Sequence, residues 1–269
     1  MLPVAIQLYS LRDDMANDVE STLRAVKEYG YEGVELAGFC GKTPEEMKKL
    51  LEEIGLVPIS AHVSLNELRA DTERVINDYK TFGCKNIVIP WLGAEDHPGK
   101  KGFLDVVKDL NRFGEILKNS GITLSYHNHD FEFGKMENGE YGFDYLYDNT
   151  DPDNLKMQMD TCWVRVAGEN PVKYLEKYRN RCPLLHLKDF VGQKSDNMYN
   201  LIGIDETKKE APKTFEFRPV GCGVQDFAAI IDSAEKNGVE WLIVEQDEPS
   251  MGKTPMECAK ISIDFLRNM

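Results

Sequence analysis

The residues of this chain that could do chemistry are most concentrated in the segment that follows the apolar run Ile122–Leu124. His127 and His129, two of only five histidines in the chain, stand there two positions apart. Because the side chains of a strand alternate between its two faces, both imidazoles are expected to point the same way. Asp130 and Glu132 follow within three residues of His129. Imidazoles and carboxylates together bind divalent cations, so the segment predicts a metal site at the end of a strand.

Short apolar runs alternate along the whole chain with stretches whose apolar residues recur every three or four positions, which predicts strands alternating with helices. The predicted strands are Val4–Leu8, Gly33–Leu36, Val57–His62, Asn86–Pro90, Ile122–His127, Leu155–Asp160, Leu184–Lys188 and Trp241–Glu245. The predicted helices are Asp18–Tyr29, Pro44–Ile54 between the caps Thr43 and Gly55, Asn66–Phe82, Gly102–Lys118, Tyr141–Asp148, Pro171–Tyr178, Gln225–Asn237 and Thr254–Leu266.

Repeated β/α units of this number and length predict a single (β/α)8 TIM barrel that occupies residues 1–269, with a metal site at the C-terminal ends of its strands. A doubly wound open sheet is the alternative, but no G-x-G-x-x-G fingerprint follows an early strand. One long irregular segment, about Val191–Val220, follows the seventh predicted strand. Loops of this length in a compact domain are usually functional or mobile, and in a barrel this one is expected over the mouth.

Polar and ionisable residues stand at the ends of nearly all the predicted strands. In a barrel these ends converge on one face, where active sites form. The strand ends carry Gln7, Glu35, His62, Trp91, His127 with His129, Asp160, His186 with Lys188, and Glu245 with Asp247. Each residue taken alone could be a helix cap, a solvated loop residue or a packed core residue. Their coincidence at one predicted face is what indicates a functional site.

The composition limits the partners that we expect. The chain has 46 acidic residues against 32 Lys and Arg, a formal charge of −14, and such an average field repels a phosphate backbone. Nucleic acid is therefore not an expected partner. No apolar stretch approaches the roughly 20 residues that span a bilayer, and the N-terminus lacks the pattern of a signal peptide. We expect a cytoplasmic protein whose six scattered cysteines are mostly free thiols.

These strand-end residues are where the chain resembles a family, the sugar phosphate isomerase/epimerase group of xylose isomerase-like TIM barrels. The resemblance covers essentially the whole chain. The segments that carry it are Ile6–Arg12, Gly30–Leu36, Ser60–His62, Tyr126–His129, Asp160–Trp163, His186–Asp189, Val220–Gly223 and the strand with Glu245. It implies a small-molecule sugar or sugar phosphate as substrate, one divalent ion (Mn, Mg, Co or Zn) as cofactor, and a homo-oligomer or a small partner subunit as possible assemblies.

The resemblance also implies a ligand set for the ion, namely a Glu, an Asp, a His and a Glu from strands five to eight. The last three correspond to Asp160, His186 and Glu245. The first usually belongs to a Glu-Asn-His triplet, whereas this chain reads His127-Asn128-His129. Either His127 binds the metal or Glu132 reaches back into the site, and we expect His127.

The remaining roles follow from the chemistry that such an ion supports. A base must remove a proton next to the sugar carbonyl, and Glu245 is the first candidate, with His127, His129 and Glu132 behind it. Lys188 could donate to the developing oxyanion. The expected substrate-binding residues are Glu35, His62, Trp91 and Arg218.

Three functions are compatible with these residues. The first is a metal-dependent isomerase or epimerase that acts through an enediolate. The second is a lyase that cleaves 3-keto-glycosides by proton abstraction and elimination, as related barrels do with C-glycosides. The third is a sugar-binding barrel without turnover. An apurinic endonuclease is disfavoured because those related barrels carry more His and Glu ligands, for three zinc ions, and because this chain is acidic.

Overall fold

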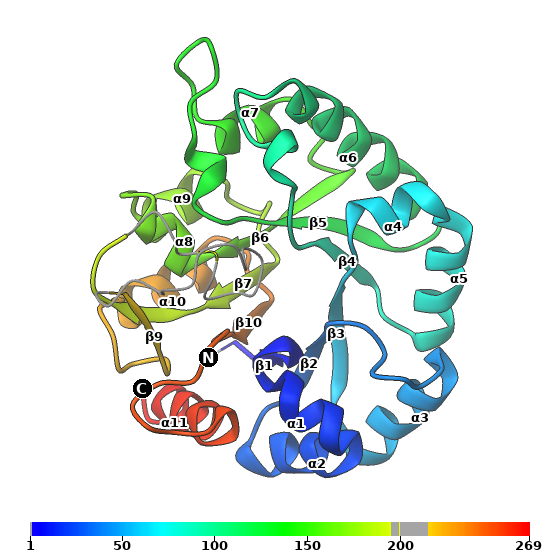
Figure 1. Cartoon of the computed structure of the whole chain (residues 1–269), viewed down its shortest axis with the longest axis vertical. Helices are drawn as coiled ribbons and strands as arrows, with labels where there is room; N and C mark the ends of the chain where they lie inside the picture. Colours follow the sequence, from blue (N-terminus) through cyan, green and yellow to red (C-terminus); the bar gives the residue numbers. More distant parts are fainter. Residues whose placement is uncertain (1, 195–198, 200–214) are drawn as a thin grey trace.

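The fold is a closed barrel of eight parallel strands surrounded by helices (Figure 1). It is a computed structural model that describes residues 2–194, 199 and 215–269. The barrel strands follow the order β1-β10-β7-β6-β5-β4-β3-β2. Their bounds are β1 Val4–Gln7, β2 Gly33–Leu36, β3 Val57–His62, β4 Asn86–Ile89, β5 Thr123–His127, β6 Leu155–Asp160, β7 Leu184–Leu187 and β10 Trp241–Val244. The predicted TIM barrel is thereby confirmed.

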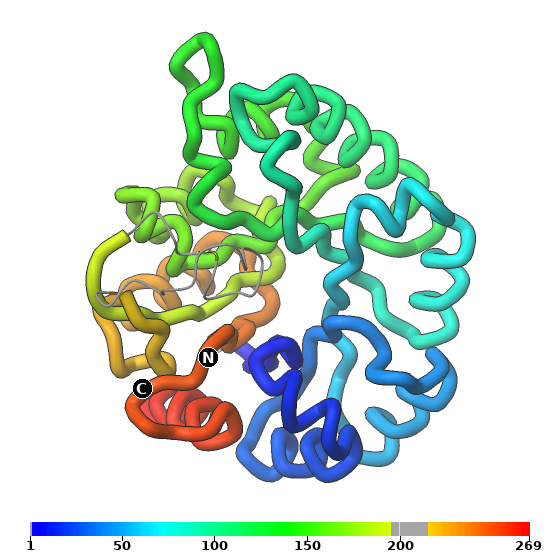
Figure 2. Tube along the Cα trace, in the orientation of Figure 1, coloured from blue at the N-terminus to red at the C-terminus, as the bar shows by residue number. Residues whose placement is uncertain are grey.

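The chain runs once around the barrel, and its first and last units meet where β1 pairs with β10 (Figure 2). The α-helices are α1 Arg12–Asn17, α2 Val19–Tyr29, α3 Pro44–Ile54, α4 Leu65–Ala70, α5 Thr72–Phe82, α6 Lys101–Asn119, α7 Gly142–Asp148, α8 Thr161–Val166, α9 Pro171–Lys177, α10 Phe227–Lys236 and α11 Pro255–Arg267. Short 3₁₀ helices in the described part of the chain include η1 Leu8–Leu11, η2 Ala94–Asp96 and η3 Phe131–Phe133.

Most helix ends lie close to where the sequence predicts them, and one predicted helix is divided. Thr43 and Glu46 form the expected capping box of α3, and Gly55 ends that helix with a left-handed backbone. The single helix predicted over Asn66–Phe82 is instead α4 followed by α5. Asp71 separates them, since its side chain accepts a hydrogen bond from Arg74 N and starts a new helix.

The interior of the barrel changes from apolar to polar along the strands. Ala5, Ile59, Val88, Leu184 and Ile243 pack together as an apolar cluster apart from the larger core under the helices. Side chains that point inward recur every second residue, so the next inward positions on three of these strands belong to Gln7, His186 and Glu245. All three side chains are buried. The barrel therefore carries an apolar floor with a polar layer above it, at the carboxyl ends of the strands.

An antiparallel ribbon outside the barrel was not predicted. It consists of β8 Asp189–Val191 and β9 Glu216–Arg218. The carboxylate of Asp189 accepts hydrogen bonds from the backbone N–H groups of Gly221, Gly223 and Gln225, which holds the chain beyond β9 against β8. The irregular segment predicted over 191–220 thus contains a short strand. Residues 195–198 and 200–214 lie outside the described residues, and the expected cover over the mouth stays a prediction.

Two further expectations concern the whole chain. The six cysteines are free thiols, as predicted, and Cys84, Cys162, Cys182 and Cys258 are buried. Within the described residues, every helix is too short or too polar to cross a membrane.

Gly33 is predicted to be sensitive to substitution, because β2 lies very close to β3 at this position. A Cβ added to Gly33 would lie 2.8 Å from Ile59 Cγ2 and 2.9 Å from the carbonyl oxygen of Val57. We expect Gly33→Ala to lower the free energy of unfolding by about 1–3 kcal/mol through overpacking. Urea unfolding measures the change, with Glu28→Ala on the exposed face of α2 as the control. An unchanged midpoint for Gly33→Ala would contradict this packing.

Candidate active site

The polar layer opens into a pocket of about 370 Å³ at the carboxyl ends of the barrel strands. The pocket is lined by Tyr9, Ala37, His62, Pro90, Trp91, His127, His129, Lys188, Glu245 and Asp247. These residues come from strand ends or from the first residues beyond them, because inward-facing positions there no longer pack against the apolar floor. The lining combines two aromatic rings with imidazoles, carboxylates and one ammonium group.

Four side chains beside the pocket are arranged to hold a cation. His127, Asp160, His186 and Glu245 each offer one ligand atom, and these atoms lie within 4.8 Å of one another. His186 Nδ1 is 3.0 Å from Glu245 Oε2, and His127 Nε2 is 3.9 Å from Asp160 Oδ2. These are the four residues expected as metal ligands, and the structure brings them together from β5, β6, β7 and the end of β10.

The environment of Asp160 fits a bound cation. One carboxylate oxygen, Oδ1, caps α8 by accepting hydrogen bonds from the backbone N–H groups of Cys162 and Trp163. The other oxygen, Oδ2, is buried and has no hydrogen-bond partner, and the ammonium group of Lys188 lies 3.8 Å from it. Burial raises the pKa of Asp160 to about 7. An ion at this oxygen would satisfy it and stabilise its charge, so the donor set fits a divalent metal.

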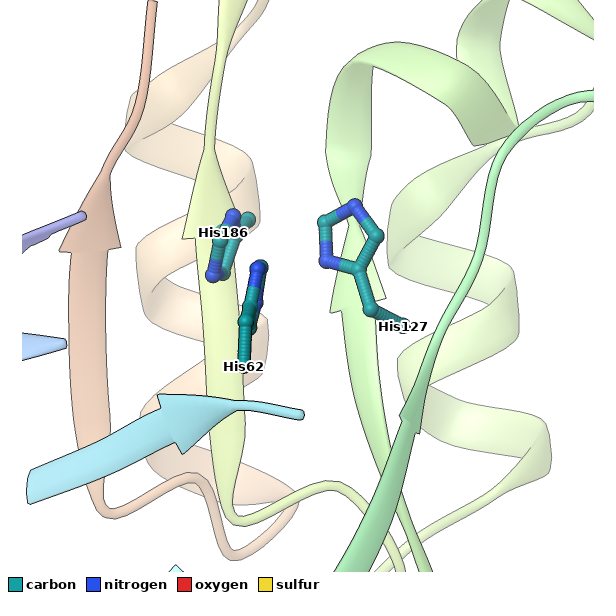
Figure 3. A group of neighbouring side chains, drawn as sticks. All are labelled: His62, His127 and His186. Atoms are coloured by element: carbon teal, nitrogen blue, oxygen red, sulfur yellow. The ribbon is translucent and has the colours of Figure 1, made fainter. Parts of the chain in front are cut away.

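Three histidine rings lie close together at the ends of their strands (Figure 3). His62 on β3, His127 on β5 and His186 on β7 also offer nitrogen atoms within 4.8 Å of one another. Acceptor oxygens occupy the space beside these nitrogens. Glu35 Oε1 is 2.7 Å from His186 Nε2 and 3.1 Å from His62 Nε2. The three rings therefore form a hydrogen-bonded cluster, and the nitrogen of His186 that remains for an ion is Nδ1, which faces Glu245.

Lys188 supplies a buried positive charge. Its side chain is 1% exposed, and its Nζ is 3.0 Å from Glu245 Oε2 and also pairs with Asp247. Burial lowers the pKa of Lys188, but the carboxylates of Asp247, Glu245 and Asp160 outweigh it and hold the pKa well above its usual value. Burial raises the pKa of Glu245, yet Lys188 and His186 lower it well below the usual range. At neutral pH the site thus holds a carboxylate and an ammonium group in contact.

The strand-five side of the pocket carries a neutral imidazole. Burial, together with the charge of Lys188, lowers the pKa of His129 well below its usual value. The ring of Trp91 packs edge-on against His129 with centroids 4.8 Å apart, and Trp163 contacts it from another side. His129 Nδ1 is buried without a hydrogen-bond partner. The imidazole therefore stays available to a substrate or a proton.

Three residues predicted as a base or as substrate contacts do not line this pocket. Glu132 is fully buried, and its carboxyl group accepts hydrogen bonds from Tyr126 Oη at 2.5 Å and His129 N at 2.8 Å. Glu35 lies beneath the pocket floor, where it binds His62 and His186 instead of reaching solvent. Arg218 lies on β9 and pairs with Glu216 at 2.9 Å. Their predicted roles as base and as substrate contacts stay untested.

Two residues near the site were not predicted. Tyr9 lines the pocket from η1, directly after β1. Gln158 is buried in β6, and its Oε1 lies 3.0 Å from both His62 Nε2 and His127 Nδ1. The period of two along β6 offered a signal for Gln158, since it precedes Asp160 by two residues and must share its face. No comparable pattern marks Tyr9, because the chain has already left the strand there.

The chain is similar to known proteins over most of its length. A family model described as xylose isomerase-like TIM barrel matches residues 23–269. Relatives named inosose dehydratase from Mesomycoplasma hyopneumoniae (strain 7448) and Clostridium beijerinckii (strain ATCC 51743 / NCIMB 8052) are each 27% identical. The first alignment covers 91% of this chain and 88% of the relative, and the second covers 93% and 89%.

Solved structures share the fold. A sugar phosphate isomerase/epimerase from Parabacteroides distasonis has a TM-score of 0.80 at 23% identity, over 99% of this chain and 93% of that one. A probable 3-DHS dehydratase from Bacillus anthracis has a TM-score of 0.78 at 15% identity, over 99% of both chains. At these identities the likeness concerns the barrel alone.

The raised pKa of the buried Glu132 carboxyl group is expected to make the stability of the protein depend on pH. Burial raises its pKa from 4.5 to about 8, so the folded protein keeps this proton up to about pH 8, whereas the unfolded chain releases it near pH 4.5. Between these values the folded state binds more protons, so stability falls as the pH rises. We expect Glu132→Gln, which cannot ionise, to lose less stability between about pH 5 and pH 8 than the wild type does.

Denaturant unfolding at both pH values tests this expectation. Glu137→Gln, at an exposed position five residues further on, is the control and should follow the wild type. Parallel pH profiles for wild type and Glu132→Gln would mean that Glu132 is ionised in the folded protein.

Proposed function

The chain belongs to the xylose isomerase-like TIM-barrel family, and we propose that it is a metal-dependent lyase acting on a polyhydroxylated ketone. In this proposal the enzyme removes the proton next to the carbonyl group and then expels an oxygen substituent from the neighbouring carbon. The leaving group is water, as in a dehydratase, or an alcohol, as in the cleavage of a 3-keto-glycoside. Both reactions begin with the same proton abstraction.

The distribution of acid and base groups around the pocket favours a lyase. Glu245 and Lys188 lie in contact on one side, while the strand-five side offers the imidazoles of His127 and His129. Glu132, the carboxylate that could have mirrored Glu245, bonds to Tyr126 instead. An epimerase of the two-glutamate kind needs a base on each face of the sugar. Elimination needs one base and one acid, and the Glu245–Lys188 pair offers both.

The names of the relatives support this choice of reaction and of substrate class. Relatives aligned over about nine-tenths of the chain are named inosose dehydratase, and a structure with the same barrel is described as a probable 3-DHS dehydratase. Trp91 and Tyr9 offer ring faces for the carbon skeleton of such a substrate, and His62 offers a polar edge. A pocket of about 370 Å³ suits a single six-membered ring with its hydroxyl groups.

One divalent ion would be held by His127, Asp160, His186 and Glu245. Bound there, it supplies Lewis acidity that polarises the carbonyl group and stabilises the negative charge left by the proton. Mn, Mg, Co and Zn all accept a donor set of imidazoles and carboxylates.

The protein's own groups perform the proton transfers. Glu245 lines the pocket as a carboxylate and takes the proton from the carbon next to the carbonyl. Lys188 lies 3.0 Å from Glu245 Oε2 and lines the same pocket, so its ammonium group can give a proton to the departing oxygen, which leaves as water or an alcohol. The proton that Glu245 took from carbon then returns to Lys188 across their contact. The rings of Trp91 and Trp163 around His129 limit the access of water on the other side.

An isomerase or epimerase is the second candidate. The observation that favours it is the neutral imidazole of His129, which lines the pocket and could exchange a second proton with the sugar. The product separates the candidates, because elimination yields an unsaturated ketone whereas isomerisation keeps the formula of the substrate. A non-catalytic sugar-binding barrel would show affinity without either product and without proton exchange. A homo-oligomer or small partner subunit and a cytoplasmic location stay predictions.

The metal site is tested through Asp160. We expect the purified wild type to bind about one Mn²⁺ per chain, and Asp160→Asn to bind it at least about 10-fold more weakly, because a ligand charge is lost while the α8 cap acceptor is kept. Asp226→Asn, at the exposed N-cap of α10, is the matched control and should bind like the wild type. Unchanged Mn²⁺ binding by Asp160→Asn and by Asp160→Ala would remove Asp160 from the ligand set.

The base is tested through Glu245. We expect Glu245→Gln to bind a substrate ketone but to exchange its α-proton with deuterated water about 10²–10⁴-fold more slowly, since the amide cannot accept the proton. Metal content is measured in parallel, because Glu245 is also a proposed ligand. Glu248→Gln, on a half-exposed carboxylate three residues on, should exchange like the wild type. If metal-loaded Glu245→Gln exchanges at the wild-type rate, the base is another group and His129 is the next to be tested.

A further inference from the structure

We propose that Gln158 is a positioning residue that fixes the tautomer of His127 and so allows a histidine to act as the metal ligand contributed by β5. The inference rests on the metal site proposed above and adds a role for a residue that the sequence did not single out. It explains how His127 can serve where members of the family that the chain resembles use a glutamate.

The position of Gln158 is determined by the register of two neighbouring strands. His127 on β5 pairs with Gln158 on β6. Gln158 Oε1 lies 3.0 Å from His127 Nδ1, while Gln158 Nε2 donates a hydrogen bond to Glu35 Oε2. Both side chains are buried, so water does not compete for these contacts.

Glu35 determines which way the amide of Gln158 is turned. Donor groups surround the side chain of Glu35, so its oxygens act as acceptors. It already receives hydrogen bonds from Gln7 Nε2 at 2.7 Å and Ser60 Oγ at 2.5 Å. The nitrogen of the Gln158 amide must therefore face Glu35, and its oxygen must face the histidines.

This orientation fixes the proton of His127. An amide oxygen accepts, so Nδ1 of His127 must carry the hydrogen and donate it to Gln158 Oε1. A neutral imidazole with a proton on Nδ1 has its lone pair on Nε2. Nε2 is the nitrogen 3.9 Å from Asp160 Oδ2, at the cation site. Since metals bind the lone pair of a neutral imidazole, the hydrogen bond to Gln158 presents the correct nitrogen to the ion.

The same oxygen serves a second ring. His62 Nε2 lies 3.0 Å from Gln158 Oε1 and 3.1 Å from Glu35 Oε1. An amide oxygen has two lone pairs and can accept from both histidines. The rings seen in Figure 3 are thus oriented by acceptors on Gln158 and Glu35. Glu35 orients the ring of His186 in the same way that Gln158 orients His127. Glu35 bonds to Nε2 of His186, so Nδ1 of that ring faces Glu245.

The test compares Gln158→Met with the wild type in two measurements. Methionine keeps the length of the side chain and removes the acceptor. ¹⁵N NMR of the imidazoles in metal-free protein reports which nitrogen of His127 carries the proton, and we expect the Nδ1–H form in the wild type and its loss in the variant. Titration calorimetry with Mn²⁺ alone should show about 10–100-fold weaker binding by Gln158→Met.

Two further variants control the test. Ser125→Ala removes a buried hydroxyl group without a hydrogen-bond partner on the same strand as His127, and it should match the wild type in both measurements. Gln158→Glu keeps an oxygen toward His127, and with its second oxygen protonated it can still donate to Glu35, so it should restore the Nδ1–H form. If Gln158→Met does not fold, Gln158→Glu serves as the test variant instead. Loss of the Nδ1–H form in Gln158→Glu, which retains the oxygen, would then count against the proposal.

The outcomes separate this inference from the proposed function. An Nδ1–H tautomer and an Mn²⁺ affinity that both survive in Gln158→Met would overturn the positioning role. Absence of Mn²⁺ binding by the wild type would overturn the metal-dependent function and the ligand role of His127, whereas the tautomer of the metal-free protein would still show whether Gln158 controls the ring.

Discussion

The burial of four carboxylates inside one barrel is the constraint on which the rest of the site depends. Glu35, Asp160, Glu245 and Asp247 are each at most 5% exposed. Removing an ionised carboxylate from water costs several kcal/mol even after relaxation, so each needs donors or cations nearby. Lys188 lies against Glu245 and Asp247, while donors from neighbouring strands surround Glu35. Asp160 Oδ2 has no hydrogen-bond partner, which is why the arrangement fits a cation.

The closed barrel makes this arrangement possible because it brings the ends of strands distant in sequence within hydrogen-bond reach. Glu35 on β2 bonds to His186 on β7, although 151 positions separate them in sequence. The apolar cluster that includes Ala5, Leu184 and Ile243 fills the barrel below and excludes water from the polar layer above. Low local polarity strengthens each hydrogen bond in the layer, and it equally raises the cost of leaving one group without its partner. The polar layer therefore tolerates few independent substitutions.

The part of the site that the sequence predicted is the part governed by strand periodicity. His127, Asp160, His186 and Glu245 stand at or just beyond strand ends, where a period of two and a closed barrel determine the direction of a side chain. Side chains beyond the strands were less predictable. Glu132 lies in a 3₁₀ helix that turns its carboxylate toward Tyr126, and Arg218 lies on a ribbon strand that no periodicity indicated. Glu35 was placed at the correct strand end, but hydrogen bonds across the barrel hold it below the pocket.

The resemblance implies a glutamate at the β5 position, and the presence of His127 there alters the charge that a metal would meet. With His127 neutral, the four proposed ligands carry two negative charges, from Asp160 and Glu245, which balance those of a divalent ion. A glutamate at the β5 position would add a third charge and weaken the attraction of the ion for electrons from a substrate carbonyl. The same change takes away a carboxylate base from the strand-five side of the pocket. In the proposed function, a histidine oriented by Gln158 would favour charge stabilisation next to Glu245 over proton return from the opposite face, as an elimination requires.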